Sequence, residues 1–95
     1  MKTITLQIGN SDDKLTQAEW CEFVTAIGSI VAAYCKDVHF AGAPPANAPW
    51  QNFCWVLAIE DDELVTSAFQ RQITDCRKKY QQDSAAITEG KTLFV

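Results

Sequence analysis

The stretch Trp50-Gln51-Asn52-Phe53-Cys54-Trp55-Val56-Leu57-Ala58-Ile59 decides the fold. Because side chains alternate between the two faces of a strand, this stretch predicts one strongly apolar face and one milder face. The strongly apolar face consists of Phe53, Trp55, Leu57 and Ile59, and the milder face consists of Trp50, Asn52, Cys54, Val56 and Ala58. A strand that is apolar on both faces is expected at the centre of a sheet.

Residues 3–8 predict a second strand with one buried face. Apolar and polar residues alternate along it with the two-residue period of a strand. The apolar positions are Ile4, Leu6 and Ile8, and the polar positions are Thr3, Thr5 and Gln7. Residues 9–14, Gly-Asn-Ser-Asp-Asp-Lys, then turn the chain, because Gly and Asn adopt positive φ readily and Asp forms Asx turns.

Residues 16–34 predict a helix of about five turns. Thr16 and Glu19 form a capping box at its start, and Leu15 and Trp20 occupy the two positions of a hydrophobic staple. Trp20 is thereby explained as a structural residue. Apolar residues recur at steps of three and four along the helix: Trp20, Phe23, Val24, Ile27, Ile30, Val31 and Tyr34.

The remaining sequence predicts a short strand at 38–41, a loop at 42–48, a second helix and a closing strand. The loop is too rich in Pro, Gly and Ala for a helix or strand. Acidic residues 60–63 stand at the start of the second helix, where the positive end of the helix dipole favours carboxylates. Its buried stripe is expected to contain Leu64, Val65, Ala68, Phe69, Ile73, Cys76 and Tyr80. Residues 84–88, a turn at Glu89 and Gly90, and residues 91–95 predict a strand or a terminal hairpin.

The order of these elements, β-α-β-β-α-β with an extra strand if residues 91–95 pair, predicts a ferredoxin-like sandwich of the α+β class. Two helices would cover one face of an antiparallel sheet whose central strands are residues 3–8 and 50–59. No linker divides residues 1–95, so we expect a single domain. The face away from the helices would be either a dimer interface or the floor of a ligand site. It would carry Thr3, Thr5, Gln7, His39, Trp50, Asn52, Cys54 and Val56.

Composition and charge narrow the classes of partner. The net charge of −4 at pH 7 opposes binding to phosphate backbones, so a free nucleic acid is not an expected partner. No apolar run approaches the length of a signal peptide or a membrane helix, so we expect a cytoplasmic protein that does not bind membranes. Because a chain of 95 residues builds only a small core, a homodimer is expected.

Signals for metals, cofactors and catalysis are weak. The four cysteines, Cys21, Cys35, Cys54 and Cys76, contain no C-x₂-C unit and are expected to be buried free thiols. His39 is the only histidine, and a structural role is more typical of a lone strand histidine than a metal ligand. The sequence has no nucleophile elbow, P-loop, dinucleotide fingerprint or zinc-protease motif. We therefore expect no metal and no cofactor.

Two segments are candidates for a binding surface. The loop after the first strand offers Asn10, Asp12, Asp13 and Lys14, and the segment after the Pro-rich loop offers Trp50, Gln51 and Asn52. In such a surface a ring supplies contact area while carboxylates and amides supply direction. Because their strands would be neighbours, we expect the two segments to lie close together. Two structural alternatives stay open, since tryptophans of small domains are mostly core and carboxylates before a helix are mostly capping groups. Residues 80–84 form a second polar corner, which also serves to end the second helix.

Three segments resemble a group of small uncharacterised proteins of bacteria and their phages or mobile elements. They are residues 8–17 with Glu19 and Trp20, residues 48–52 with Cys54 and Trp55, and residues 82–84 with residues 88–90. The resemblance spans most of the chain and brings no catalytic residue with it. It implies a protein that acts by binding, either sequestering a small signal or blocking a host protein.

Two classes of function follow. The first is a non-enzymatic binding protein whose Trp50 stacks on the ring of a small molecule, such as a nucleotide-derived signal, or contacts a host protein. Lys14 or Lys91 would then meet an anion. The second is a small dimeric ferredoxin-like enzyme that uses His39 and a carboxylate on the open sheet face.

Overall fold

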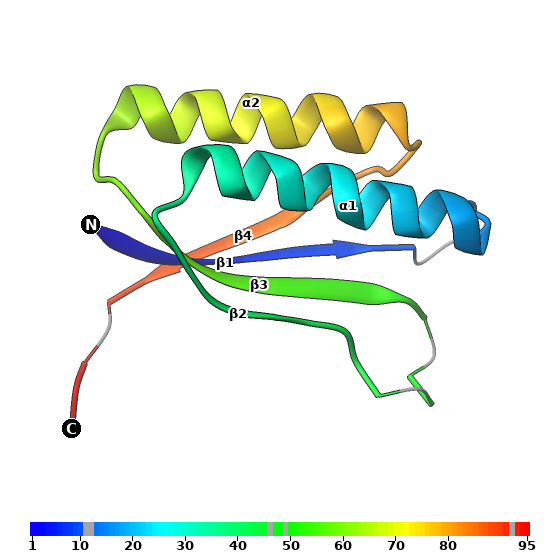
Figure 1. Ribbon diagram of the computed structural model, residues 1–95, viewed down its shortest axis with the longest axis horizontal. Helices are drawn as coiled ribbons and strands as arrows, with labels where there is room; N and C mark the ends of the chain where they lie inside the picture. The colour runs from blue at the N-terminus through cyan, green and yellow to red at the C-terminus, as the bar shows by residue number, and fades with distance from the viewer. Residues whose placement is uncertain (11–12, 46, 49, 92) are drawn as a thin grey trace.

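The computed structural model describes residues 1–10, 13–45, 47–48, 50–91 and 93–95. Within these residues the chain forms β1 (Lys2–Gly9), α1 (Gln17–Tyr34), β2 (Asp37–Gly42), β3 (Asn52–Ile59), α2 (Glu63–Lys79) and β4 (Ala86–Gly90). The strands pair antiparallel in the order β2-β3-β1-β4. Both helices lie side by side over one face of the sheet (Figure 1). The predicted element order, fold class and central strands are confirmed.

The register of the two central strands decides which residues share a face. β1 and β3 pair along their whole length, with Leu6 opposite Trp55 and Thr5 opposite Val56. The first pair faces the helices and the second faces away from them, as the alternation predicts. The buried core consists of Ile4, Leu6, Ile8, Leu15, Trp20, Phe23, Ile27, Val31, Trp55, Leu57, Ile59, Phe69 and Ile73.

Both helices begin as their sequences predict. Thr16 caps α1 by accepting a hydrogen bond from the backbone N–H of Glu19, whose carboxylate accepts one from the backbone N–H of Thr16. Asp62 caps α2 by accepting from the backbone N–H groups of Leu64 and Val65. These caps fix where the connecting loops end. In the described part of the chain, neither helix combines the length and the apolar character needed to cross a bilayer.

Leu64 does not belong to the buried stripe of α2. Its side chain is 82% exposed, whereas Phe69 and Ile73 are buried. Val65 lies four residues before Phe69 and therefore shares its face, while Leu64 is rotated by about 100° from Val65 around the helix. The prediction for this one position is wrong.

The chain does not turn at Glu89 and Gly90. They are the last two residues of β4, where Glu89 pairs with Ile4 and Gly90 with Thr3. Pairing with β1 satisfies backbone groups that a turn would have left to water. Of the residues that follow, 91 and 93–95 are described and contain no strand.

The four cysteines are free, as predicted, but they are not buried. Cys21 is exposed on α1, and Cys35, Cys54 and Cys76 are partly buried. Partial burial raises the pKa of the Cys35 thiol to about 11 and also raises the pKa of Cys76, against a smaller opposing effect of Lys79.

Candidate binding site at the Trp50 end of the sheet

The two segments predicted to form a binding surface meet at one end of the sheet. β1 ends and β3 begins there, with Gly9 opposite Asn52. One more hydrogen bond extends the pairing, because the backbone N–H of Asn10 donates to the carbonyl of Gln51 over 2.9 Å. The segment after β1 and the segment before β3 therefore form one continuous surface.

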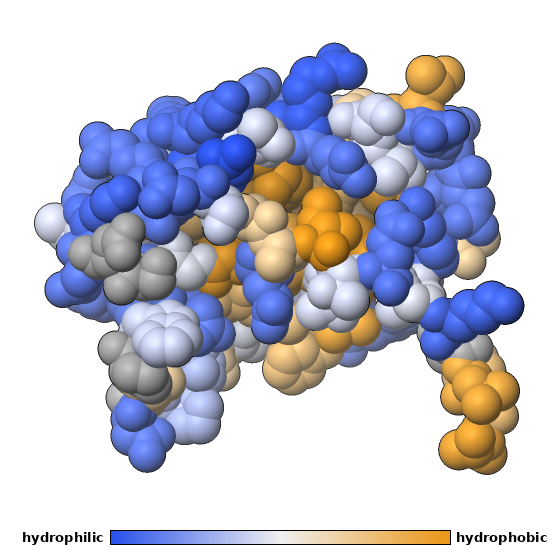
Figure 2. All heavy atoms as spheres, turned by 180° about the vertical axis from the view of Figure 1, so that it is seen from behind, coloured by the Kyte–Doolittle hydropathy of each residue, from blue (hydrophilic) through white to orange (hydrophobic). Residues whose placement is uncertain are grey.

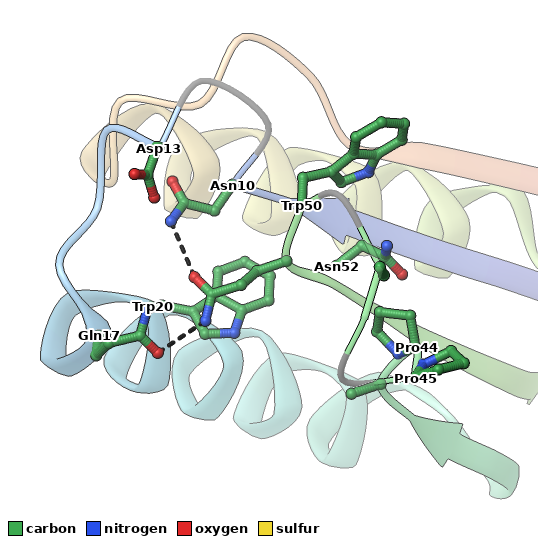
Figure 3. A pocket seen from close by; sticks show the side chains of 11 residues that line it. Asn10, Asp13, Gln17, Trp20, Pro44, Pro45, Trp50 and Asn52 are labelled. Carbon is green, nitrogen blue, oxygen red and sulfur yellow. Dashed lines mark hydrogen bonds between the residues drawn. The ribbon is translucent and has the colours of Figure 1, made fainter.

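A hollow of about 510 Å³ lies on this surface, and we call it the first hollow (Figure 3). Its lining is Asn10, Asp13, Gln17, Trp20, Ala43, Pro44, Pro45, Ala48, Trp50, Gln51 and Asn52. It thus brings together the end of β1, the start of α1, the loop after β2 and the start of β3. Five of the predicted site residues are among its lining: Asn10, Asp13, Trp50, Gln51 and Asn52.

Trp50 is the one tryptophan with a largely exposed side chain. It is 54% exposed, whereas Trp20 and Trp55 are 8% and 4% exposed. The alternative of a core role therefore applies to Trp20 and Trp55 and not to Trp50. In Figure 3 the Trp50 indole projects away from the amide side chains of Asn10 and Gln17.

Trp50 and Asn52 also line a second hollow, of about 390 Å³. The other residues around it are Gln7, Ile8, Gly9, Gln82, Asp83, Ser84 and Ala86. This hollow contains the polar corner between α2 and β4. Trp50 consequently borders two hollows, one toward α1 and one toward β4.

Asn10 is buried, and its side chain forms hydrogen bonds within the protein. It is 2% exposed, its Oδ1 accepts from the backbone N–H of Leu15 at 3.0 Å, and its Nδ2 donates to the Leu15 carbonyl at 3.1 Å. Nδ2 also donates to Oε1 of Gln51 at 3.1 Å. A buried amide with its bonds satisfied in this way ties the end of β1 to the start of α1. Asn10 therefore positions the other site residues.

Gln51 extends this network to the surface. Its Nε2 donates to Oε1 of Gln17 over 2.8 Å, as the dashed lines of Figure 3 show. The Asn52 carboxamide makes no hydrogen bond to any other described residue. Asn52 is thus able to both donate and accept toward a bound molecule.

The acidic and basic residues of the loop before α1 do not lie at one common site. Asp12 lies outside the described residues. Asp13 is exposed at the first hollow and has φ 53°, a left-handed conformation that Asp tolerates better than most residues. Lys14 lines neither hollow, and its Nζ lies 3.9 Å from the Asp83 carboxylate. Among its described lining residues, the first hollow has no Lys, Arg or His.

A third hollow, of about 920 Å³, lies at the opposite end of the sheet on the face away from the helices. It is lined by Met1, Lys2, Thr3, Asp37, His39, Val56, Ala58, Asp61, Gly90, Lys91 and Phe94. Lys91 is therefore not part of the Trp50 site, and that prediction is wrong because β4 runs away from the site toward its end. His39 and the nearby carboxylates also belong to this distant region. The described residues contain no group of three or more His, Cys, Asp and Glu side chains arranged to hold a metal ion.

Sequence reasoning missed Gln17 as a site residue. It is the first residue of α1, and the capping box beside it explained that segment as structure alone. The polar corner at residues 80–84 was singled out without a function. There Gln82 is 9% exposed, and its side-chain Nε2 donates to the Tyr80 carbonyl. The backbone carbonyl of Gln82 accepts from the Arg77 guanidinium. Only the folded arrangement places this corner beside Trp50.

Comparison with known proteins adds evidence on the fold. No protein-family model matches the sequence, and no curated protein matches it significantly. A dimeric ferredoxin-like protein of unknown function from Thermobifida fusca is similar in structure, with a TM-score of 0.65 and 17% identity over 97% of this chain and 92% of that chain. A hydantoinase/carbamoylase family amidase from Burkholderia ambifaria matches 95% of this chain over 27% of its own length, with 15% identity and a TM-score of 0.49. The first similarity supports the same fold class as the sheet order described above, and the chain has a ferredoxin-like fold.

Proposed function

We propose that this protein is a non-enzymatic binding protein that holds a small molecule at the Trp50 end of its sheet. The observation that carries the proposal is the half-exposed Trp50 indole, which borders two hollows whose linings contain amide side chains. An exposed indole beside a concave surface offers a ring contact that its own fold does not use. The first hollow, at about 510 Å³, falls in the size range of small-molecule sites.

The network behind the hollow supports binding because it is preorganised. Asn10 is buried and holds Gln51, and Gln51 holds Gln17. Side chains fixed before a ligand arrives lose little conformational freedom when it binds. This preorganisation supports the binding of a ligand in the first hollow.

The resemblance to small phage and mobile-element proteins is part of this proposal. Its three segments include Gln17, Trp50 and Gln82, which line the two hollows. A cytoplasmic protein of that group would act by sequestering a small signal. Blocking of a host protein through the exposed Trp50 is the other outcome that the experiment below distinguishes.

We further propose a homodimer formed through the open sheet face. Phe40 is 56% exposed on β2, opposite Val56 on the face that the helices leave uncovered. The exposed apolar residues 93–95 at the C-terminus project from the rest of the molecule and add further apolar surface (Figure 2). The similar Thermobifida fusca protein is described as dimeric. Burial of this face would supplement the small core.

A small enzyme using His39 is the second candidate. The third hollow is lined by His39, Asp37 and Asp61, so one of these two Asp residues would supply the carboxylate of this function. The Asp61 carboxylate accepts a hydrogen bond from the amino group of Met1 at 3.0 Å. Because the same face is proposed as the dimer interface, this function and the dimer exclude each other unless the partner completes the hollow.

Native mass spectrometry of the protein purified from a bacterial host tests the proposal. We expect a bound small molecule that is released on denaturation and is absent from the Trp50→Ala and Asn52→Ala variants, while their melting temperatures stay within a few degrees of the unchanged protein. Asp12→Ala and Asp13→Ala should weaken retention in the same way. His39→Ala is the matched control and should retain the molecule.

Two results would contradict the proposal. Co-purification of a stoichiometric protein instead of a small molecule, lost in Trp50→Ala, would establish blocking of a host protein. Loss of cellular activity in a folded His39→Ala variant, with Trp50→Ala silent, would establish the enzyme.

A further inference from the structure

The hydrogen-bond network fixes the orientation of three amide side chains. Asn10 stands between the N–H and the C=O of Leu15, so its oxygen must face the first and its nitrogen the second. Its nitrogen then donates to Gln51, which must present its oxygen. The nitrogen of Gln51 donates in turn to Gln17, which must also present its oxygen. The buried Asn10 therefore determines the direction of every amide up to the surface.

The orientation of the Gln51 amide also fixes the orientation of the Gln17 side chain. Because Oε1 of Gln17 accepts from Gln51, its Nε2 is directed away from the network, and it has no hydrogen-bond partner among the described residues. Gln17 lines the first hollow and is exposed. The α1 end of the hollow thus offers a fixed hydrogen-bond donor.

Asp13 gives the same hollow a hydrogen-bond acceptor and a negative charge. An ionised carboxylate only accepts hydrogen bonds, and it repels anions. The positive end of α1 does not reverse this preference, because the Glu19 carboxylate and the Thr16 hydroxyl already cap it. The described lining of the hollow carries no compensating cation. Among the described lining residues, a phosphate group would therefore meet the Asp13 carboxylate and no positively charged side chain.

We propose that the first hollow takes an uncharged heteroaromatic lactam, a flat ring that carries a carbonyl beside an N–H, as in a phosphate-free nucleobase or nucleoside. The carbonyl accepts from Nε2 of Gln17 and the N–H donates to Asp13. The rings of Pro44 and Pro45 add flat apolar surface to the same hollow, and Trp50 borders it. This inference rests on the proposed function and replaces a nucleotide-derived anion with a neutral ring.

Inosine, purine riboside and inosine 5′-monophosphate are the probes that test it. Inosine has the lactam, purine riboside has the same ring system with acceptors alone, and the monophosphate keeps the lactam and adds a negatively charged phosphate group. Titrations are followed by two-dimensional ¹⁵N–¹H NMR of the Trp50 indole and the Gln17 and Asn52 side-chain amides. We expect inosine to shift these signals and to bind at least about tenfold more tightly than either relative.

Gln17→Glu is the decisive variant. The new carboxylate still accepts from Gln51, so the network is kept, but the donor toward the hollow is replaced by an acceptor. We expect at least about a tenfold loss of inosine affinity with an unchanged melting temperature, since an acidic residue is favoured in the first turn of a helix. Gln72→Glu, the same change at an exposed position of α2 that lines neither hollow, is the matched control and should leave inosine affinity unchanged. Asp13→Asn removes the negative charge but keeps an acceptor oxygen and suits the left-handed backbone, so it should reduce the disadvantage of the monophosphate.

The results separate this inference from the proposed function. Tighter binding of the monophosphate than of inosine, or unchanged inosine affinity in Gln17→Glu, would overturn the inference while the site remains a binding site. Silence of all three probes at millimolar concentration, with a different class of molecule retained from the host, would do the same. Silence of the probes with no molecule retained at all would overturn both.

Discussion

Replacement of Asn10 by Ala should be among the most destabilising changes of a polar residue in this protein. The side chain makes three hydrogen bonds at 3.0–3.1 Å from a position that is 2% exposed. Its removal also leaves the backbone N–H and C=O of Leu15, a 5% exposed residue, without these partners. An unsatisfied buried group costs about 1–3 kcal/mol, so we expect a loss of about 2–4 kcal/mol in the free energy of unfolding.

A loss of this size is readily measured. For a chain of about 100 residues, each kcal/mol lowers the melting temperature by roughly 4–8 °C, so a loss of about 2–4 kcal/mol predicts a decrease of about 8–32 °C for Asn10→Ala. Thermal and urea denaturation followed by far-UV circular dichroism provide the assay. Asn52→Ala is the matched control, because the Asn52 amide has no hydrogen bond to other described residues, and its melting temperature should fall by no more than a few degrees.

Asn10→Asp provides an independent check if Asn10→Ala is too unstable to study. The new carboxyl group keeps the acceptor for the Leu15 N–H but directs an oxygen at the Leu15 carbonyl and at Oε1 of Gln51. This repulsion and burial raise its pKa in the folded state above the unfolded value of about 4. The variant should therefore be least stable relative to the unchanged protein near neutral pH, and the difference should shrink as the pH falls toward the unfolded pKa and below it. A melting temperature for Asn10→Ala within about 3 °C of the unchanged protein would refute the reasoning about the network.

Three further predictions follow from burial and exposure. Trp20→Ala and Trp55→Ala should each lower the free energy of unfolding, measured in urea, by about 3–5 kcal/mol. Trp50→Ala should lower it far less, because Trp50 is 54% exposed. Equal losses for Trp50→Ala and Trp55→Ala would show that Trp50 belongs to the core. Sedimentation at micromolar concentration should show a dimer. Val56→Lys on the open sheet face should give a monomer, whereas Ala33→Lys at an exposed position of α1 should not. A monomer mass for the unchanged protein would contradict the dimer proposal. Cys21, exposed on its helix, should react with a disulfide reagent at pH 8 much faster than Cys35, whose pKa of about 11 leaves very little thiolate at that pH. Mass spectrometry of the labelled peptides checks this order, and equally fast labelling of Cys35 would contradict it.

The sequence predicted the parts of this structure that depend on neighbours along the chain. Alternation from Ile4 to Ile8 identified β1, and the two-sided apolar stretch from Phe53 to Ile59 identified β3 as central. The capping box at Thr16 placed the start of α1 to the residue. These signals are local, because strand alternation, helix periodicity and capping are set by spacings of two to four residues.

Exposure of Trp50 could also be predicted, since the indole follows directly on a loop that Pro and Gly keep out of regular structure. That Glu89 and Gly90 belong to a strand could not be predicted, because a Gly in a strand and a Gly in a turn have the same local sequence. Pairing with β1, more than 80 residues earlier in the chain, decided that they belong to β4.

The composition of the candidate site was decided by tertiary structure alone. Gln51 meets Asn10 across 41 residues and Gln17 across 34 residues, and no local pattern encodes which amide will be buried and which will face the hollow. Asn10 and Lys14 look equally available in the sequence, yet the fold encloses the first and directs the second toward Asp83. Local spacing therefore determined the elements and the polar character of this end of the sheet. The roles of its individual side chains depended on which distant segments the sheet order brought together, because burial and hydrogen-bond partners exist only after the chain has folded.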